Sequence, residues 1–493
     1  MIHTFGHPAT GEWVLVDDRH VERVGTGEPP SADRTVNLPG ATIIPGFVDA
    51  HVHLTATGVR ASRPEAGAVK SARELLDVAT SLQPGTAGIT FLHGFDESKW
   101  DLPELPKMAD LEGVRNPLIL VRTDSHMSLA NPTALMQSGA AELSGVERDA
   151  AGDFTGVAKE QANDRLLQWF SDSLSEHEIE EFQLRAAALA TSRGITSLHE
   201  MSMPRAHGAR DLEILLEHGE RLPVEVVPYV ATTDVGYALD LGLSRIGGDL
   251  ALDGSVGART AHLTQPYPDS AGTGARYHED DALFQFLHDA HLAGLQVGLH
   301  AIGDAAIEQA VSCWELVYQM LDSRARRHFR ARRHRIEHFE MPSAAQTERA
   351  ARLGLAASVQ PAFDVEWGGR GQLYEQRLGE TRASQMNPFK TLQERGIEIG
   401  AGSDSPITAL DPAAGVSALE QHHDPLQRFT RQEAIRLFTR GGARLARQED
   451  KKGHLAPGTH ADFAAYDADP MTADLATLRP VVTVSLGREV YVS

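Results

Sequence analysis

The stretch EDDALFQFLHDAHLAGLQVGLHAIGD, residues 279–304, decides the fold. Its first part spaces apolar residues as on one face of a helix. After Gly294 a short apolar strand follows, and His300 closes it. A helix that leads directly into a buried strand is one unit of a parallel β/α arrangement. The same alternation recurs through much of the chain.

Eight apolar segments of this kind are separated by helix-like segments such as residues 176–194. Eight strands with intervening helices predict an α/β fold of the (β/α)8 TIM-barrel type. The predicted strands cover residues 43–54, 194–201, 223–230, 247–255, 295–304, 334–340, 355–361 and 397–406.

Two regions lie outside this pattern. Residues 55–175 separate the first two strands by far more than a normal connection and include a strand-like piece at 116–129. We interpret them as a subdomain inserted over the barrel mouth. The chain ends, 1–44 and 453–493, both alternate in β fashion. Because chain ends often lie close together, we expect them to form one small β-sandwich domain beside a barrel that spans 45–452.

Composition excludes several classes of protein. With 46 Lys and Arg against 68 Asp and Glu, the formal net charge of the 493-residue chain is −22. Such a chain is a poor candidate for binding nucleic acid or anionic membranes. Cys313 is the only cysteine, which rules out an intrachain disulfide and Cys-rich metal sites. We see neither a secretory signal nor an apolar run of about 18 residues, and we expect a cytoplasmic protein.

Metal-ligand residues recur at the predicted strand ends. His51 and His53 close the first strand, and alternate residues of a strand point to the same face. His300 closes the fifth strand, His338 the sixth and Asp404 the eighth. The carboxyl ends of barrel strands meet at one mouth, so these five side chains should share a pocket. Imidazoles with a carboxylate suit zinc and also manganese, iron or nickel.

Each of these signals is weak alone. A single His-x-His pair is more often a surface or packing pair, and a lone strand-end histidine more often belongs to the core. Asp404 in GSDSP is also compatible with a helix cap. The common position of all five residues, each at the same end of its strand, favours the metal site.

Several motifs together resemble one family. PGFVDAHVHL, HAIGDAAI, RIEHFE and AGSDSPI look like the amidohydrolase superfamily, and GHLAPGTHADFAAYD resembles its C-terminal β-domain. GFDESKW, RTDSHMSLANPTAL, TGVAKE and LDGSVGARTAHL resemble amidohydrolase family 3, in the group that includes N-substituted formamide deformylases. The resemblance covers nearly the whole chain and implies a metal-dependent (β/α)8 hydrolase.

The resemblance also implies roles for individual residues. The pair matching His51 and His53 binds one metal with the acid matching Asp404, whereas His300 and His338 bind a second metal or the substrate. Many members bridge two metals with a carboxylated lysine, which in this branch lies four residues before the Asp of DGS. This chain has Asp249 there. We expect Asp249 to supply the bridging carboxylate directly. Its side chain is shorter than a carboxylated lysine, so the number of bound metals, one or two, stays open.

Other matched positions carry smaller roles. His126 and Arg259 match motif residues that touch substrate or support ligands, and Trp100 is a candidate for the pocket lid. Arg259 is equally compatible with an ion pair, and Trp100 with simple packing. Lys159 and Glu160 are further candidates from the insertion, with an exposed ion pair as the alternative.

The predicted function is hydrolysis of a non-peptide C–N bond, in an amide or N-substituted formamide, by metal-activated water. Asp404 would move the proton, and His300 or His338 would stabilise the oxyanion. A deaminase or cyclic-amide hydrolase, an esterase or lactonase, and a non-catalytic assembly protein are the alternatives on this scaffold. The expected partner is a small-molecule substrate, and the resemblance also allows a homodimer.

Overall fold

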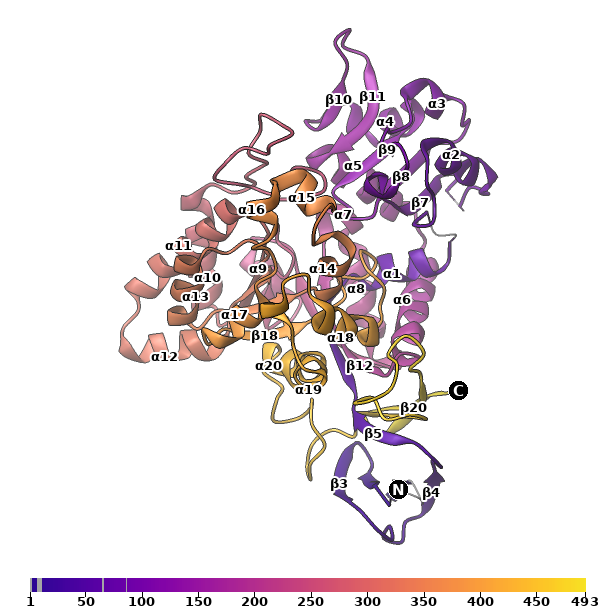
Figure 1. Ribbon diagram of the computed structural model, residues 1–493, viewed down its shortest axis with the longest axis vertical. Helices are drawn as coiled ribbons and strands as arrows, with labels where there is room; N and C mark the ends of the chain where they lie inside the picture. The colour runs from indigo at the N-terminus through magenta and orange to yellow at the C-terminus, as the bar shows by residue number, and fades with distance from the viewer. Residues whose placement is uncertain (1, 7–10, 64–65, 86) are drawn as a thin grey trace.

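The computed structural model describes residues 2–6, 11–63, 66–85 and 87–493 (Figure 1). Eight parallel strands, interleaved with helices, make up its central part, so the chain is of the predicted α/β class. These strands are β6 (Phe47–Val52), β12 (Ile195–Ser202), β13 (Glu225–Val230), β14 (Arg245–Ile246), β15 (Gln296–Ala301), β16 (Arg335–His338), β17 (Ala356–Val359) and β18 (Glu398–Ala401).

The eight strands form two parallel sheets. One has the order β13-β12-β6 and the other β14-β15-β16-β17-β18. Backbone hydrogen bonds join the sheets at both edges. Beside β6 and β18, the amide of Asp404 donates to the carbonyl of His51 and that of His53 to Ser405, both at 2.8 Å. Beside β13 and β14, the amide of Gly247 donates to Val230 at 2.8 Å.

All eight strands differ from the predicted bounds at their ends, and two of them differ in more than that. The fourth, predicted over 247–255, lies at Arg245–Ile246. Gly247 and Gly248 follow with φ of 79° and 63°, and two left-handed residues interrupt an extended ladder. The first, predicted over 43–54, is divided at Gly46, because β5 (Thr42–Pro45) pairs with a different sheet from β6.

Helices cover the strands on the outside (Figure 1). The two helices predicted at 176–194 and 279–295 are confirmed as α6 and α10, and Ser175 and Glu178 form a capping box at the start of α6. The helices after β6 and its insertion are α6 (Glu176–Thr191), α7 (Pro204–His207), α8 (Ala209–His218), α9 (Val235–Asp240), α10 (Asp280–Leu292), α11 (Asp304–Met320), α12 (Ser323–Arg332), α13 (Ala344–Leu353), α14 (Pro361–Trp367), α15 (Leu373–Leu378), α16 (Glu380–Ala383), α17 (Phe389–Glu394), α18 (Pro412–Gln421), α19 (Arg431–Arg436) and α20 (Gly442–Leu445).

The segment between β6 and α6 builds a sheet of its own, at the top of Figure 1. The sheet has the order β10-β11-β9-β8-β7, and only β7 and β8 are parallel in it. The strand-like piece predicted at 116–129 supplies two of these strands. The elements are α1 (Leu54–Ala61), α2 (Ala72–Ser81), β7 (Thr90–Phe95), α3 (Met108–Glu112), β8 (Leu118–Arg122), β9 (Met127–Ala130), α4 (Pro132–Ser138), β10 (Val146–Arg148), β11 (Phe154–Lys159) and α5 (Glu160–Asp172).

Two further sheets contain the chain ends. β1 (Ile2–Gly6), β2 (Trp13–Asp17), β3 (His20–Gly25) and β4 (Arg34–Asn37) form one, in the order β3-β2-β1-β4. β5 pairs with β19 (Phe463–Tyr466), followed by β20 (Pro480–Ser485) and β21 (Arg488–Val492). Phe5 and Phe463 pack edge to face between these sheets at 5.1 Å. Among the described residues, no helix combines the length and apolarity that crossing a membrane requires.

Candidate metal centre

Six ligand-type side chains meet at the carboxyl ends of the parallel strands. Each is at least nine-tenths buried, and all line the same cavity except His51, which is fully buried. They come from β6 and the turn after it, the segment after β14, β15, β16 and the turn after β18. They are His51, His53, Asp249, His300, His338 and Asp404.

The distances within this metal-centre cluster are short. Asp404 Oδ1 lies 3.4 Å from His51 Nε2 and 3.2 Å from His53 Nε2. Asp249 Oδ1 lies 3.0 Å from His300 Nδ1 and 3.3 Å from His338 Nε2. The other oxygen of Asp249, Oδ2, is 3.6 Å from His53 Nε2. Asp249 therefore lies between His53 and the pair of His300 and His338.

Three of the four histidines have an acceptor at Nδ1, the ring nitrogen that points away from the cluster. His51 Nδ1 lies 2.9 Å from Glu337 Oε2, and His338 Nδ1 lies 2.8 Å from Gln360 Oε1. His53 Nδ1 donates to the carbonyl of Met201 at 2.9 Å. Carbonyl and carboxylate oxygens only accept, so in these three rings Nδ1 carries a proton and Nε2 is the nitrogen that faces the cluster. This is the arrangement in which imidazoles bind metals.

A divalent ion fits these residues. Ligands about 2.0–2.1 Å from a tetrahedral zinc are separated from one another by roughly 3.3–3.4 Å. The oxygen–nitrogen distances of 3.2 and 3.4 Å from Asp404 match that edge. His51 Nε2 is buried and makes no hydrogen bond within the described part of the chain. A buried nitrogen of this kind is costly unless a further group uses its lone pair.

Charge complementarity within the cluster is strong in the metal-free chain. Burial disfavours the charged form of His53, but the hydrogen bond and charge of Asp404 outweigh it and raise its pKa to about 9. Burial is likewise outweighed at His300, where Asp249 raises the pKa to about 9. Conversely, despite burial, the neighbouring histidines hold the pKa of both Asp249 and Asp404 below its ordinary value. The carboxylates are therefore ionised and ready to bind a cation.

Backbone strain accompanies two of the six residues. His338 has φ of 69° and Asp404 has φ of 54°, values that non-glycine residues rarely adopt. Such conformations cost about 1–3 kcal/mol each and persist only where surrounding contacts impose them. Both side chains lie in the cluster, so the strained conformations coincide with two of its members.

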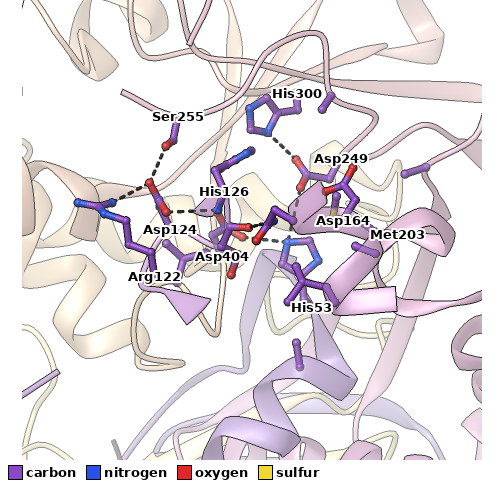
Figure 2. Close-up of a pocket in the computed structure, with 18 of the residues that line it drawn as sticks. His53, Arg122, Asp124, His126, Asp164, Met203, Asp249, Ser255, His300 and Asp404 are labelled. Atoms are coloured by element: carbon purple, nitrogen blue, oxygen red, sulfur yellow. Dashed lines mark hydrogen bonds and ion pairs between the residues drawn. The ribbon is translucent and has the colours of Figure 1, made fainter. Parts of the chain in front are cut away.

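A cavity of about 500 Å³ opens above the cluster. His126, from the insertion, lines it with its ring 5.4 Å from that of His300. Asp124 accepts from Ser255 Oγ at 2.6 Å, from Arg122 Nη1 at 2.7 Å and from the amide of His126 at 3.2 Å (Figure 2). These bonds tie the insertion to the loop after β14 and fix His126 beside the cluster.

The other predicted neighbours separate into two groups. Glu160 lines the cavity, but Lys159 does not, and it forms an ion pair with Glu147 at 2.7 Å. Arg259 binds Asp269 bidentately at 2.6 and 3.0 Å, and Trp100 packs against Phe95 in the core of the insertion. Neither lines the cavity, so the structure does not support substrate contact by Arg259 or Trp100. Instead, Arg259 forms an ion pair, and Trp100 packs in the core of the insertion.

Several supporting residues were missed by sequence reasoning. Glu337 holds His51 and is itself held by Arg335 at 2.7 Å, and all three are fully buried. A signal was present, because Glu337 directly precedes His338 and an acid inside an apolar strand needs a partner. Gln360, directly after β17, carried no comparable signal.

A second group, Asp364, His422 and His423, also gathers metal-ligand atoms within 4.8 Å. Its ring nitrogens are already used. His422 Nε2 donates to the carbonyl of Asn387 at 2.9 Å, and His422 Nδ1 accepts from the amide of Asp424 at 3.1 Å. His423 Nδ1 lies 2.6 Å from Asp364 Oδ1. We interpret this group as a hydrogen-bonded clasp between α14 and the end of α18.

Comparison with known proteins agrees with this geometry. A model of the Amidohydrolase family, Amidohydro_3, matches residues 34–491. YtcJ of Bacillus subtilis (strain 168) is 28% identical over 97% of this chain and 96% of its own. The N-substituted formamide deformylase of Arthrobacter pascens is 23% identical over 94% of this chain and 92% of its own.

Solved structures agree as well. A crystal structure of an uncharacterized metal-dependent hydrolase from Pyrococcus horikoshii has a TM-score of 0.77 and 25% identity, covering 97% of this chain and 100% of its own. The family match, the shared fold and the six converging ligand residues all indicate the same chemistry. The chain therefore belongs to the amidohydrolase family and is a metal-dependent hydrolase.

Proposed function

We propose that this protein hydrolyses a non-peptide C–N bond, in an amide or N-substituted formamide. The observation that carries the proposal is the metal-centre cluster, in which imidazole nitrogens and ionised carboxylates gather at the base of a cavity. The likeness to a formamide deformylase supports the bond type. We also propose that the eight strands close a (β/α)8 barrel over 45–452, with 55–175 inserted and 1–44 and 453–493 as the β-sandwich domain.

The ligands divide into two sets around Asp249. His51, His53 and Asp404 would hold one divalent ion, most simply zinc, given two imidazole nitrogens that lie 3.4 and 3.2 Å from Asp404 Oδ1. His300 and His338 would hold a second ion or the substrate carbonyl. Asp249 has one oxygen near His300 and His338 and the other near His53, which suits a bridge between the two sets.

The chain's own residues supply the proton transfers. An ion bound by His51 and His53 would polarise the carbonyl and lower the pKa of water towards ~7. Asp404 Oδ1 faces these two histidines, which leaves its second oxygen to accept a proton and return it to the leaving nitrogen. His126 points into the cavity beside His300, where its imidazole can donate to the developing oxyanion.

The test combines metal analysis of the purified protein with a screen of N-formyl and N-acyl amines. The proposal expects one or two divalent ions per chain, and an amine with a carboxylic acid as products. Matched esters and cyclic amidines belong in the same screen. Faster cleavage of the ester would indicate an esterase, and release of ammonia from a ring would indicate a deaminase. A metal-free protein without turnover would overturn the proposal.

A further inference from the structure

The cavity wall supplied by α5 changes character along the helix. Glu160 and Asp164 line the cavity near the helix start, whereas Leu167, Phe170 and Leu174 line it further along. The spacing of these positions, three or four residues apart, places them on one face of the helix or just beyond its end. Asn163, beside Asp164 on α5, donates to the carbonyl of Ser125 at 2.8 Å, directly before His126, so the acidic end of α5 is the end near the metal centre.

Apolar side chains from two other elements face the far half of α5. Val59 comes from α1, which begins directly after His53, and Phe91 comes from β7. The rings of Phe91 and Phe170 stack with centroids 3.9 Å apart. We call the wall formed by Val59, Phe91, Leu167, Phe170 and Leu174 the apolar arm. Arg60, which also lines the cavity, donates to the carbonyl of Pro406.

The apolar arm is much longer than an amide group. Asp164 and Phe170 are six residues apart on α5, and a helical rise of 1.5 Å per residue makes this roughly 9 Å. A cavity of about 500 Å³ is in the range that holds drug-sized ligands. A formamide or acetamide group alone would leave the arm filled with water against apolar side chains, which is unfavourable.

From this continuity of the arm with the metal centre, we propose that the substrate carries an elongated uncharged alkyl or aryl group that lies along the far half of α5. The inference rests on the proposed function, because it names the class of amide that the same site cleaves. A negative charge at the junction of the arm and the metal centre is disfavoured, since Glu160 and Asp164 line the cavity at that end of α5. Their own repulsion supports this, because burial and the charge of Glu160 raise the pKa of Asp164 to about 6.

The first test compares chain lengths in two series, N-alkylformamides and N-acyl methylamines. Each buried methylene strengthens binding by roughly fourfold. In the series that is hydrolysed, the octyl member should exceed the methyl member in kcat/KM by at least about 100-fold. Leu167→Asp should lower this ratio at least tenfold by placing a charge in the arm. Leu167→Trp, which fills the arm without a charge, should do the same if the Asp variant folds poorly.

The matched control is Leu184→Asp, on the outer face of α6, where the leucine is 45% exposed and lies outside the cavity. It should leave the ratio at the wild-type value. Equal kcat/KM for octyl and methyl members, or an unchanged ratio in both Leu167 variants, would overturn the inference while leaving the proposed function intact.

A second measurement does not depend on turnover. Octan-1-ol should bind one molecule per chain in calorimetry, with a negative heat-capacity change, and Leu167→Asp should weaken binding at least tenfold. Binding that Leu167→Asp removes, without hydrolysis of any amide, would retain the apolar arm and reject the proposed function. Absence of saturable octanol binding, or binding that both Leu167 variants leave unchanged, would reject the arm.

Discussion

Two groups of histidine and aspartate in this molecule use the same residue types in opposite ways. In the metal-centre cluster, His51 Nδ1 is anchored by Glu337, and His51 Nε2 makes no hydrogen bond within the described residues. In the clasp of Asp364, His422 and His423, both nitrogens of His422 have backbone partners. Proximity of metal-ligand residues therefore does not by itself define a metal site. A metal site also needs ring nitrogens that no hydrogen bond uses, on histidines whose other nitrogen is held by a hydrogen bond.

The largest effect should come from removing the anchored ligands. His51→Ala combined with His53→Ala deletes two direct ligands, and we expect loss of bound metal and of activity together. Metal content by mass spectrometry and turnover measure this. A double variant with stoichiometric metal and normal turnover would remove this pair from the site.

Asp404→Asn should distinguish the role of Asp404 as a metal ligand from its role as a proton carrier. Asn keeps the shape and one oxygen but cannot take up and return a proton, so turnover should fall about 10²–10⁴-fold while much of the metal stays. The acid limb of the pH–rate profile should move. If Asp404 were only a helix cap, Asn would replace it well. Turnover within a few-fold of wild type would therefore favour the cap.

Asp249→Ala should report the number of metals. If Asp249 bridges two ions, metal content should drop towards one per chain. If the site holds one ion, content should stay the same while the rate falls, because Asp249 also holds His300 and His338. Unchanged content and unchanged rate would place Asp249 outside the site.

The clasp should respond in stability alone. Asp364→Ala removes the carboxylate that holds both the backbone amide and the ring Nδ1 of His423. We therefore expect a loss of about 1–3 kcal/mol in the free energy of unfolding. Metal content should not change. Denaturant unfolding and metal analysis of the same sample measure both. Loss of an ion from this variant would make the clasp a second metal site.

The smallest effect is a difference in pH dependence, tested in metal-free protein. Asp404 raises the pKa of His53 to about 9 from 6.5, so His53 adds stability below pH 6.5 that is lost as pH rises to about 9. Burial lowers the pKa of His422, so its contribution is present above 6.5 and lost on acidification. His53→Gln should flatten the alkaline loss and His422→Gln the acidic one. Identical unfolding profiles for both variants would contradict the comparison.

The sequence was sufficient for the residues whose position follows from strand periodicity. His51, His300 and His338 lie on or at the end of predicted strands, and the carboxyl ends of parallel strands meet. Asp249 followed from its spacing to a motif. Its strand was misplaced, because the left-handed conformations of Gly247 and Gly248 are a property of the folded backbone.

Loop side chains were less predictable, because distant contacts set their direction. Arg259 turns to Asp269 from a residue with φ of 60°, and Trp100 turns into the core of the insertion. Gln360 acquires its role only because β16 and β17 are neighbours, which places its amide oxygen behind His338. Such pairs are set by tertiary structure and leave no local pattern.

The hydrogen bonds between the turns after β6 and β18 have a consequence for synthesis. His51 and His53 leave the ribosome early, whereas Asp404 belongs to the last of the eight strands. At about 5–20 residues per second, the interval between them is roughly 20–70 s. A nascent chain cannot complete the ligand set during that time. Metal loading is therefore a late event, and a chain truncated before β18 would carry the HVH motif without the means to hold an ion tightly.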